Sequence, residues 1–115
     1  MKQIKQPRQM SVLEKLVETD REYDVKPRFN MSVKGLIDPQ SFTIWYNPYK
    51  ITDEQDFHIT LLHEWYHDIY PEQSEEQIEV RAIASYERDI KDYLVAMYPY
   101  KEWCQAFVES RKRKQ

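Results

Sequence analysis

Three observations predict that the sequence folds as an α+β domain with a small β-sheet. Two short β-rich stretches lie between helical segments, which gives the order α, β, β, α, α, α. At three places a Ser or Thr is followed by Glu or Gln at the spacing of a capping box, which marks a helix start. One Gly and six Pro in 115 residues argue against an all-β fold, and this length fits a single domain over 1–115.

The N-terminal half is expected to hold one helix and two strands. Ser11 begins a capping box, so we predict a helix over about 12–22. Residues 28–34 alternate between apolar and polar side chains, which is typical of a half-exposed strand. Residues 41–47, "SFTIWYN", are apolar or aromatic on both faces and predict a strand that is covered on both sides.

The C-terminal half is expected to be helical. Thr52 begins a helix that ends near Pro71, and Ser74 begins a long helix that runs to about Met97. A last short helix follows around Trp103. The residues expected to face inward are Phe57, Leu61, Leu62, Trp65, Ile69, Ile78, Ala82, Ile90, Tyr93, Leu94 and Met97. Residues 1–10 and 111–115 are expected to be flexible tails.

Composition narrows the function classes. The formal net charge of −3 provides no overall basic field for nucleic acid. No apolar run approaches the length of a membrane span, and the first residues lack the apolar core of a signal peptide. We therefore expect a cytoplasmic protein without a nucleic-acid or membrane partner.

The segment "LLHEWYHDIY" (61–70) contains the residues that indicate a metal site. On a helix, His63 and His67 project about 40° apart, so both imidazoles can reach one metal ion. Glu64 can reach a water on that metal without being a ligand, as the H-E-x-x-H pattern requires. Two histidines at this spacing also occur by chance. Here, however, the apolar residues of the segment project away from the histidine face of the helix, in the directions that a core requires. His58 lies on a different face, where a structural role is expected.

A catalytic zinc takes three protein ligands and a water, so a third ligand is needed. No histidine follows His67. The nearby carboxylates are Asp68, Glu72, Glu75, Glu76, Glu79, Glu87 and Asp89. Asp68 is poorly aimed, and the acidic residues at 72–76 are explained by the positive N-terminus of the next helix. Glu79, which lies one turn inside that helix among apolar and small residues, is the better candidate.

Three segments resemble gluzincin metallopeptidases, namely the ImmA/IrrE type and the small soluble minigluzincins. "TLLHEWYH" (60–67) resembles their active-site helix, and "GLIDPQSFTIWYN" (35–47) resembles the strands before it. "EVRAIASY" (79–86) resembles their glutamate helix, E-x-x-A-N-x-F-A, at Glu79 and Ala82. The departures from that helix are Ile83, Ser85 and Tyr86. The resemblance covers roughly residues 35–90.

The resemblance implies a minimal zincin-like domain: a small sheet, an active-site helix, a glutamate helix and flanking helices. His63, His67 and Glu79 would bind Zn²⁺, and Glu64 would be the general base that activates a metal-bound water to hydrolyse peptide bonds. Tyr70 and Tyr86 are candidate oxyanion donors, although tyrosines at such positions more often serve packing. A peptide or unfolded protein substrate would add as a strand along residues 28–34.

Two alternatives to an active zinc endopeptidase stay open at the level of sequence. One is a latent enzyme whose cleft is covered by a terminal segment or by self-association. The other is a non-catalytic zinc-binding module that acts through protein contacts, against which Glu64 argues because a structural site does not need that carboxylate.

Overall fold

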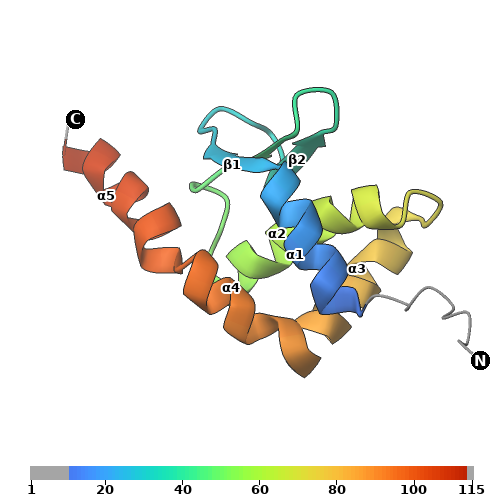
Figure 1. Ribbon diagram of the computed structural model, residues 1–115. Helices are drawn as coiled ribbons and strands as arrows, with labels where there is room; N and C mark the ends of the chain where they lie inside the picture. The colour runs from blue at the N-terminus through green and yellow to red at the C-terminus, as the bar shows by residue number, and fades with distance from the viewer. Residues whose placement is uncertain (1–10, 114–115) are drawn as a thin grey trace, which may run out of the picture.

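A small sheet and a set of helices pack around the central helix α2 in the computed structural model, which describes residues 11–113 (Figure 1). Helix α2 contacts α1, α3 and the strands β2 and β3. The elements in chain order are α1 (Val12–Glu22), β1 (Asp24–Pro27), β2 (Gly35–Asp38), β3 (Thr43–Tyr46), α2 (Glu54–Ile69), α3 (Glu75–Ser85), the π-helical η1 (Tyr86–Ile90), α4 (Lys91–Met97), the π-helical η2 (Lys101–Gln105) and α5 (Ala106–Arg113). The predicted α+β class is confirmed.

The sheet has the strand order β1-β3-β2. Strand β3 lies in the centre, parallel to β1 and antiparallel to β2. Its residues Thr43, Ile44 and Tyr46 are buried, as the aromatic and apolar run at 41–47 predicts. The strand is shorter than predicted, because Ser41 and Phe42 lie in a turn, and Phe42 is 50% exposed. This arrangement leaves β2 at an edge of the sheet, next to α2.

The predicted strand over 28–34 is wrong. Strand β1 ends at Pro27 and β2 begins only at Gly35, so these residues connect two strands. Their alternation has a different cause, because Phe29 packs in an aromatic cluster with Tyr49 and Phe107, at ring-centroid distances of 5.4 and 6.2 Å. Phe29 therefore meets α5 and a neighbouring loop rather than a strand partner, and Val33, at the other end of the segment, is 48% exposed.

Helix α1 confirms the predicted helix over 12–22, and its start follows from local chemistry. The backbone N–H of Glu14 donates to the Ser11 hydroxyl at 3.1 Å. Further along, Leu16 is fully buried, and Asp20, only 7% exposed, accepts hydrogen bonds from the hydroxyls of Tyr93 and Tyr98. A carboxylate therefore joins α1 to α4 inside the fold.

Helix α2 begins one residue later than predicted. Asp53, not Thr52, is the N-cap, and it accepts from the backbone N–H of Asp56 at 2.8 Å. Thr52 instead donates its own N–H to the Asp56 carboxylate at 2.9 Å. The core side of the helix is as predicted, with Phe57, Leu61, Leu62 and Trp65 fully buried.

His58 has the structural role that was expected of it. The ring is fully buried. Its Nε2 lies 2.7 Å from the carbonyl oxygen of Tyr98, which can only accept, so Nε2 carries the proton. Nδ1 then accepts from the Tyr86 hydroxyl at 3.2 Å. Burial is the main cause that lowers the pKa of His58, which favours this neutral ring.

The predicted long helix from Ser74 to Met97 is divided by the π-helical segment η1. Figure 1 shows that α4 runs in a different direction from α3. The Ser74 capping box is confirmed, with the backbone N–H of Gln77 donating to the Ser74 hydroxyl. Met97, expected inside, is 49% exposed, because the ring of Tyr98 fills the core position here against Trp65 and Trp103.

The last predicted helix is present as η2 followed by α5 and is longer than expected. Residues 111–113, assigned to a tail, continue α5. The guanidinium group of Arg111 lies 4.1 Å from the ring centroid of Phe29, and its Nε–H donates to the Tyr49 hydroxyl at 3.1 Å. The tail residues 1–10 and 114–115 lie outside the described residues. Among the described helices, none combines the length and the apolar character needed to span a membrane.

Candidate metal centre

Two histidines lie side by side on the face of α2 that points away from the core. The ring centroids of His63 and His67 are 4.8 Å apart. Their side chains are 15% and 26% exposed, whereas Trp65 between them is fully buried. The predicted division of the helix into an apolar back and a polar front is therefore confirmed.

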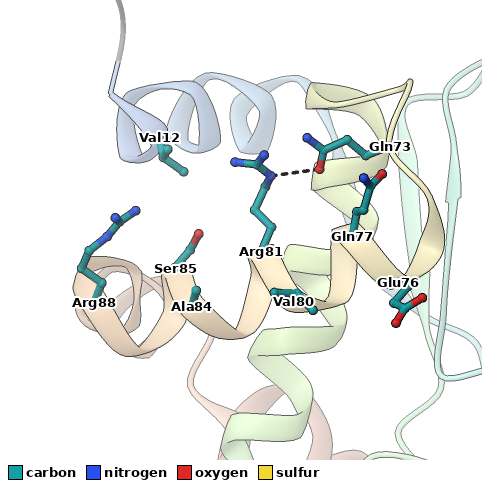
Figure 2. A pocket seen from close by; sticks show the side chains of 9 residues that line it. All are labelled: Val12, Gln73, Glu76, Gln77, Val80, Arg81, Ala84, Ser85 and Arg88. Atoms are coloured by element: carbon teal, nitrogen blue, oxygen red, sulfur yellow. Dashed lines mark hydrogen bonds between the residues drawn. The ribbon is translucent and has the colours of Figure 1, made fainter.

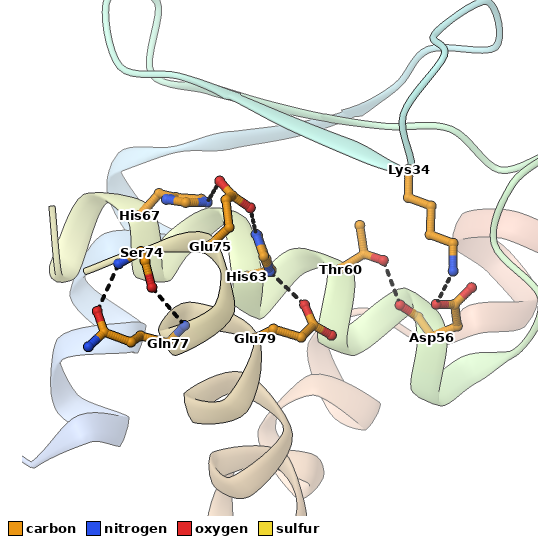
Figure 3. A network of polar contacts seen from close by, with 9 residues as sticks. All are labelled: Lys34, Asp56, Thr60, His63, His67, Ser74, Glu75, Gln77 and Glu79. Atoms are coloured by element: carbon orange, nitrogen blue, oxygen red, sulfur yellow. Dashed lines mark hydrogen bonds and ion pairs between the residues drawn. The ribbon is translucent and has the colours of Figure 1, made fainter. Parts of the chain in front are cut away.

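The carboxylate of Glu75 bridges the two histidines (Figure 3). One of its oxygens lies 2.8 Å from Nε2 of His63, and the other lies 2.8 Å from Nε2 of His67. The ligand atoms of these three residues all lie within 4.8 Å of one another, so the group could hold a metal ion. The donor set of two imidazoles and a carboxylate suits zinc.

Glu75 is a site residue that sequence reasoning passed over. Its position in the first turn of α3 was explained by the helix dipole alone, and its side chain is 76% exposed. A usable signal was present: only a short turn separates the end of α2 from the start of α3. The two helices must therefore lie side by side, with the first carboxylate of α3 nearest to His67.

Glu79, the predicted third ligand, lies against the other side of His63. Its carboxylate is 2.7 Å from Nδ1 of the ring, and its side chain is 48% exposed. His63 therefore has a carboxylate at each ring nitrogen. Burial opposes protonation of the ring, but the hydrogen bonds to Glu75 and Glu79 and the negative charges of Glu64 and Glu75 together outweigh it, so the pKa of His63 is raised. The role of Glu79 as a metal ligand stays a prediction.

Glu64 lies beside this cluster in a cavity of about 360 Å³ between β2, α2 and α3. Burial is the main cause that raises the pKa of its carboxyl to about 7, and the charges of Glu75 and Glu79 add to the effect. The charge of His63, and to a smaller extent a backbone hydrogen bond from Ile37 on β2, lower this pKa. The lining residues are Val33, Lys34, Gly35, Asp56, Ile59, Thr60, His63, Glu64, Glu75 and Glu79.

Gly35 allows β2 to lie this close to α2. A Cβ atom at this position would stand 2.8 Å from Cγ2 of Thr60 and 3.2 Å from Cγ of Glu64. Both distances are shorter than ordinary contacts, so the Thr60 and Glu64 side chains, or the two backbones that carry them, would have to shift. The only glycine of the sequence thus lies where a backbone closes the wall of the cavity.

We expect Gly35→Ala to lower the free energy of unfolding by about 1–3 kcal/mol, because the added methyl overpacks this contact. Urea unfolding of the purified protein measures the change. Thr60→Ser in the same background removes the nearest methyl but keeps the hydroxyl, which donates to the carbonyl oxygen of Asp56 at 2.7 Å. The double variant should recover part of the loss, and a neutral Gly35→Ala would contradict the argument.

Neither of the two candidate oxyanion donors lines this cavity. The ring of Tyr70 packs edge-on against Tyr66 and lies under the guanidinium group of Arg81. Tyr86 is 4% exposed and donates its hydroxyl to His58. Both tyrosines make packing contacts of the kind that the sequence argument weighed against catalysis, and no contact described here supports the oxyanion role.

Comparison with known protein families, with curated proteins and with solved structures gives no match to this chain. The arrangement of His63, His67 and the glutamates of α3 is therefore the feature that points to a function.

Proposed function

We propose that this chain is a zinc-dependent endopeptidase of the gluzincin type. The observation that carries the proposal is the placement of Glu64 in a cavity directly beside the His63, His67 and Glu75 group. A structural metal site needs only its ligands, whereas a hydrolytic site also needs a base next to the metal and space for a substrate. Glu64 is positioned as this base, and the cavity beside it offers the space.

The proposed reaction assigns separate roles to the residues of α2 and α3. His63, His67 and a glutamate of α3 would hold the ion, and bound zinc supplies Lewis-acid activation of a water and of a peptide carbonyl. Glu64 takes a proton from the attacking water and passes it to the leaving amine. The carboxylate on Nδ1 of His63 fixes the orientation of that ring, as carboxylates commonly do for metal-binding histidines.

Two glutamates compete for the third ligand position. The described contacts favour Glu75, whose two oxygens reach Nε2 of both histidines. The resemblance to gluzincins favours Glu79, which is less exposed and contacts His63. If Glu75 is the ligand, Glu79 holds the His63 ring from Nδ1.

The substrate in this proposal is a peptide or an unfolded protein. Strand β2 pairs with β3 along one side, and its first residue, Gly35, lines the cavity that holds Glu64. An extended peptide could add to β2 by backbone hydrogen bonds and so bring a peptide bond beside Glu64. In this role β2 replaces the segment 28–34.

The latent enzyme and the zinc-binding module are the alternatives that an experiment must separate from an active peptidase. The contacts described for α5 place Phe107 and Arg111 on Phe29 and Tyr49, none of which lines the cavity. Covering by residues 1–10 or by a second copy of the chain would appear as zinc binding without hydrolysis. Deletion of residues 1–10 would then restore hydrolysis if that segment covers the site.

The proposal is tested by zinc content and casein hydrolysis on the same samples of wild type, Glu75→Ala and Glu79→Ala. We expect one zinc per chain in wild type. The glutamate that binds zinc should lose zinc most strongly when replaced, and loss of the one that orients His63 should cost about 10- to 100-fold in affinity. If wild type takes up no zinc at neutral pH, the proposed function is wrong.

A further inference from the structure

The short turn between α2 and α3 determines how Glu75 meets His67. At the end of α2, the backbone N–H of Tyr70 donates to the carbonyl oxygen of Tyr66 at 2.7 Å. In the turn, the backbone N–H of Gln73 donates to the carbonyl oxygen of Tyr70 at 3.1 Å. Ser74 then caps α3, whose first residue is Glu75. Any shift of this turn therefore moves the Glu75 carboxylate relative to the two histidines.

The side chain of Arg81 holds this turn from α3. Its guanidinium carbon lies 4.0 Å from the ring centroid of Tyr70, and its Nε–H donates to Oε1 of Gln73 at 3.0 Å. Figure 2 shows the hydrogen bond from Arg81 to Gln73; both residues line the groove between α1 and α3. One side chain thus contacts both Tyr70, the C-cap residue of α2, and Gln73, which lies just before the N-cap of α3.

Arg81 acts through the turn and not on the metal group itself. At about 100° per residue, its side chain projects roughly 120° from that of Glu75 and about 160° from that of Glu79 around α3. Its described partners are Gln73 and Tyr70. The ring of Tyr70 is in turn supported by the fully buried Tyr66, at a centroid distance of 5.5 Å. Through Tyr70, Arg81 therefore connects the turn to the core.

We propose that Arg81 is a positioning residue of the metal centre, which clamps Tyr70 and Gln73 and thereby sets the approach of Glu75 to His63 and His67. This inference rests on the proposed metal site. A planar guanidinium is needed, because a lysine cannot lie flat on Tyr70 while it donates along a fixed direction to Gln73. The clamp also gives Tyr70 a role that needs no contact with a substrate.

The test compares Arg81→Met with Arg88→Met. Met retains much of the aliphatic stem and removes the guanidinium group. Arg88 lines the same groove two turns along the same face of the helical segment, and its described ion-pair partner is Asp89 at 4.0 Å, so it is the matched control. Zinc affinity is measured by competition with a chelator, and the visible spectrum of the Co²⁺-loaded protein reports the coordination geometry.

We expect Arg81→Met to bind zinc about 10- to 100-fold more weakly than wild type, with an altered Co²⁺ spectrum, and Arg88→Met to match wild type. In the metal-free protein, the backbone amides of residues 70–74 should exchange hydrogen faster in Arg81→Met only. Gln73→Ala should also weaken zinc binding and speed amide exchange in the turn, but by less than Arg81→Met. Gln73→Glu keeps the acceptor for the Arg81 side chain and should behave as wild type.

The outcomes separate this inference from the proposed function. If wild type binds zinc and Arg81→Met binds it equally well, with unchanged amide exchange in the turn, the clamp is refuted while the metal site stands. If wild type itself binds no zinc, the metal site and the clamp's role in it both fail. If Arg81→Met does not fold, Gln73→Ala decides, since it removes one partner of the clamp from an exposed turn.

Discussion

Glu64→Gln is expected to lower the rate of casein hydrolysis by about 10²- to 10⁴-fold, the usual contribution of a general base, while zinc stays bound. The amide has nearly the shape of the carboxylate, so it fills the same space in the cavity between β2 and α2. It cannot take a proton from water. The metal ligands are untouched, because Glu64 is not part of the His63, His67 and Glu75 group.

The matched control for this variant is Glu76→Gln, the same chemical change in the first turn of α3. Glu76 lines the groove between α1 and α3 and not the cavity that holds Glu64. Its replacement should leave both zinc content and hydrolysis close to wild type. Full activity of Glu64→Gln would remove Glu64 from catalysis, and equal loss of zinc and activity would show that Glu64 supports the metal instead.

Local patterns in the sequence were sufficient to predict where α1 and α3 begin and placed the start of α2 within one residue. The capping residues Ser11 and Ser74 begin α1 and α3 as expected, because these hydrogen bonds depend only on residues a few positions away. The paired placement of His63 and His67 follows in the same way from the period of one helix. The covered strand β3 was equally visible from its composition.

What could not be predicted depends on contacts between distant segments. The alternation in residues 28–34 looked like a strand because the partners of Phe29, which include Phe107 on α5, are far away in sequence. Strand β1 was missed because it is short and ends in Pro27, which cannot donate to a neighbouring strand. The approach of Glu75 to two histidines likewise depends on how α3 folds back on α2.

Asp20→Ala is expected to lower the free energy of unfolding by roughly 3–5 kcal/mol, the largest effect on stability that we predict. Asp20 is 7% exposed and accepts from the hydroxyls of Tyr93 and Tyr98. Hydrogen bonds to a charged group contribute about 1.5–3 kcal/mol each, and truncation leaves two hydroxyls inside the fold without this acceptor. A loss of this size is a large fraction of the roughly 5–15 kcal/mol that stabilises a typical domain.

Urea unfolding of Asp20→Ala beside Glu18→Ala measures this effect against a control on the same helix. Glu18 is exposed, so its replacement should change stability by less than about 0.5 kcal/mol. Asp20→Asn keeps one acceptor oxygen and should fall between wild type and Asp20→Ala. Tyr98 also packs on Trp65, and its carbonyl oxygen accepts from Nε2 of His58, so loss of the Asp20 contact should also loosen the core side of α2. An Asp20→Ala variant as stable as Glu18→Ala would mean that the two tyrosine hydroxyls find water instead, and that α1 is held to α4 by apolar packing alone.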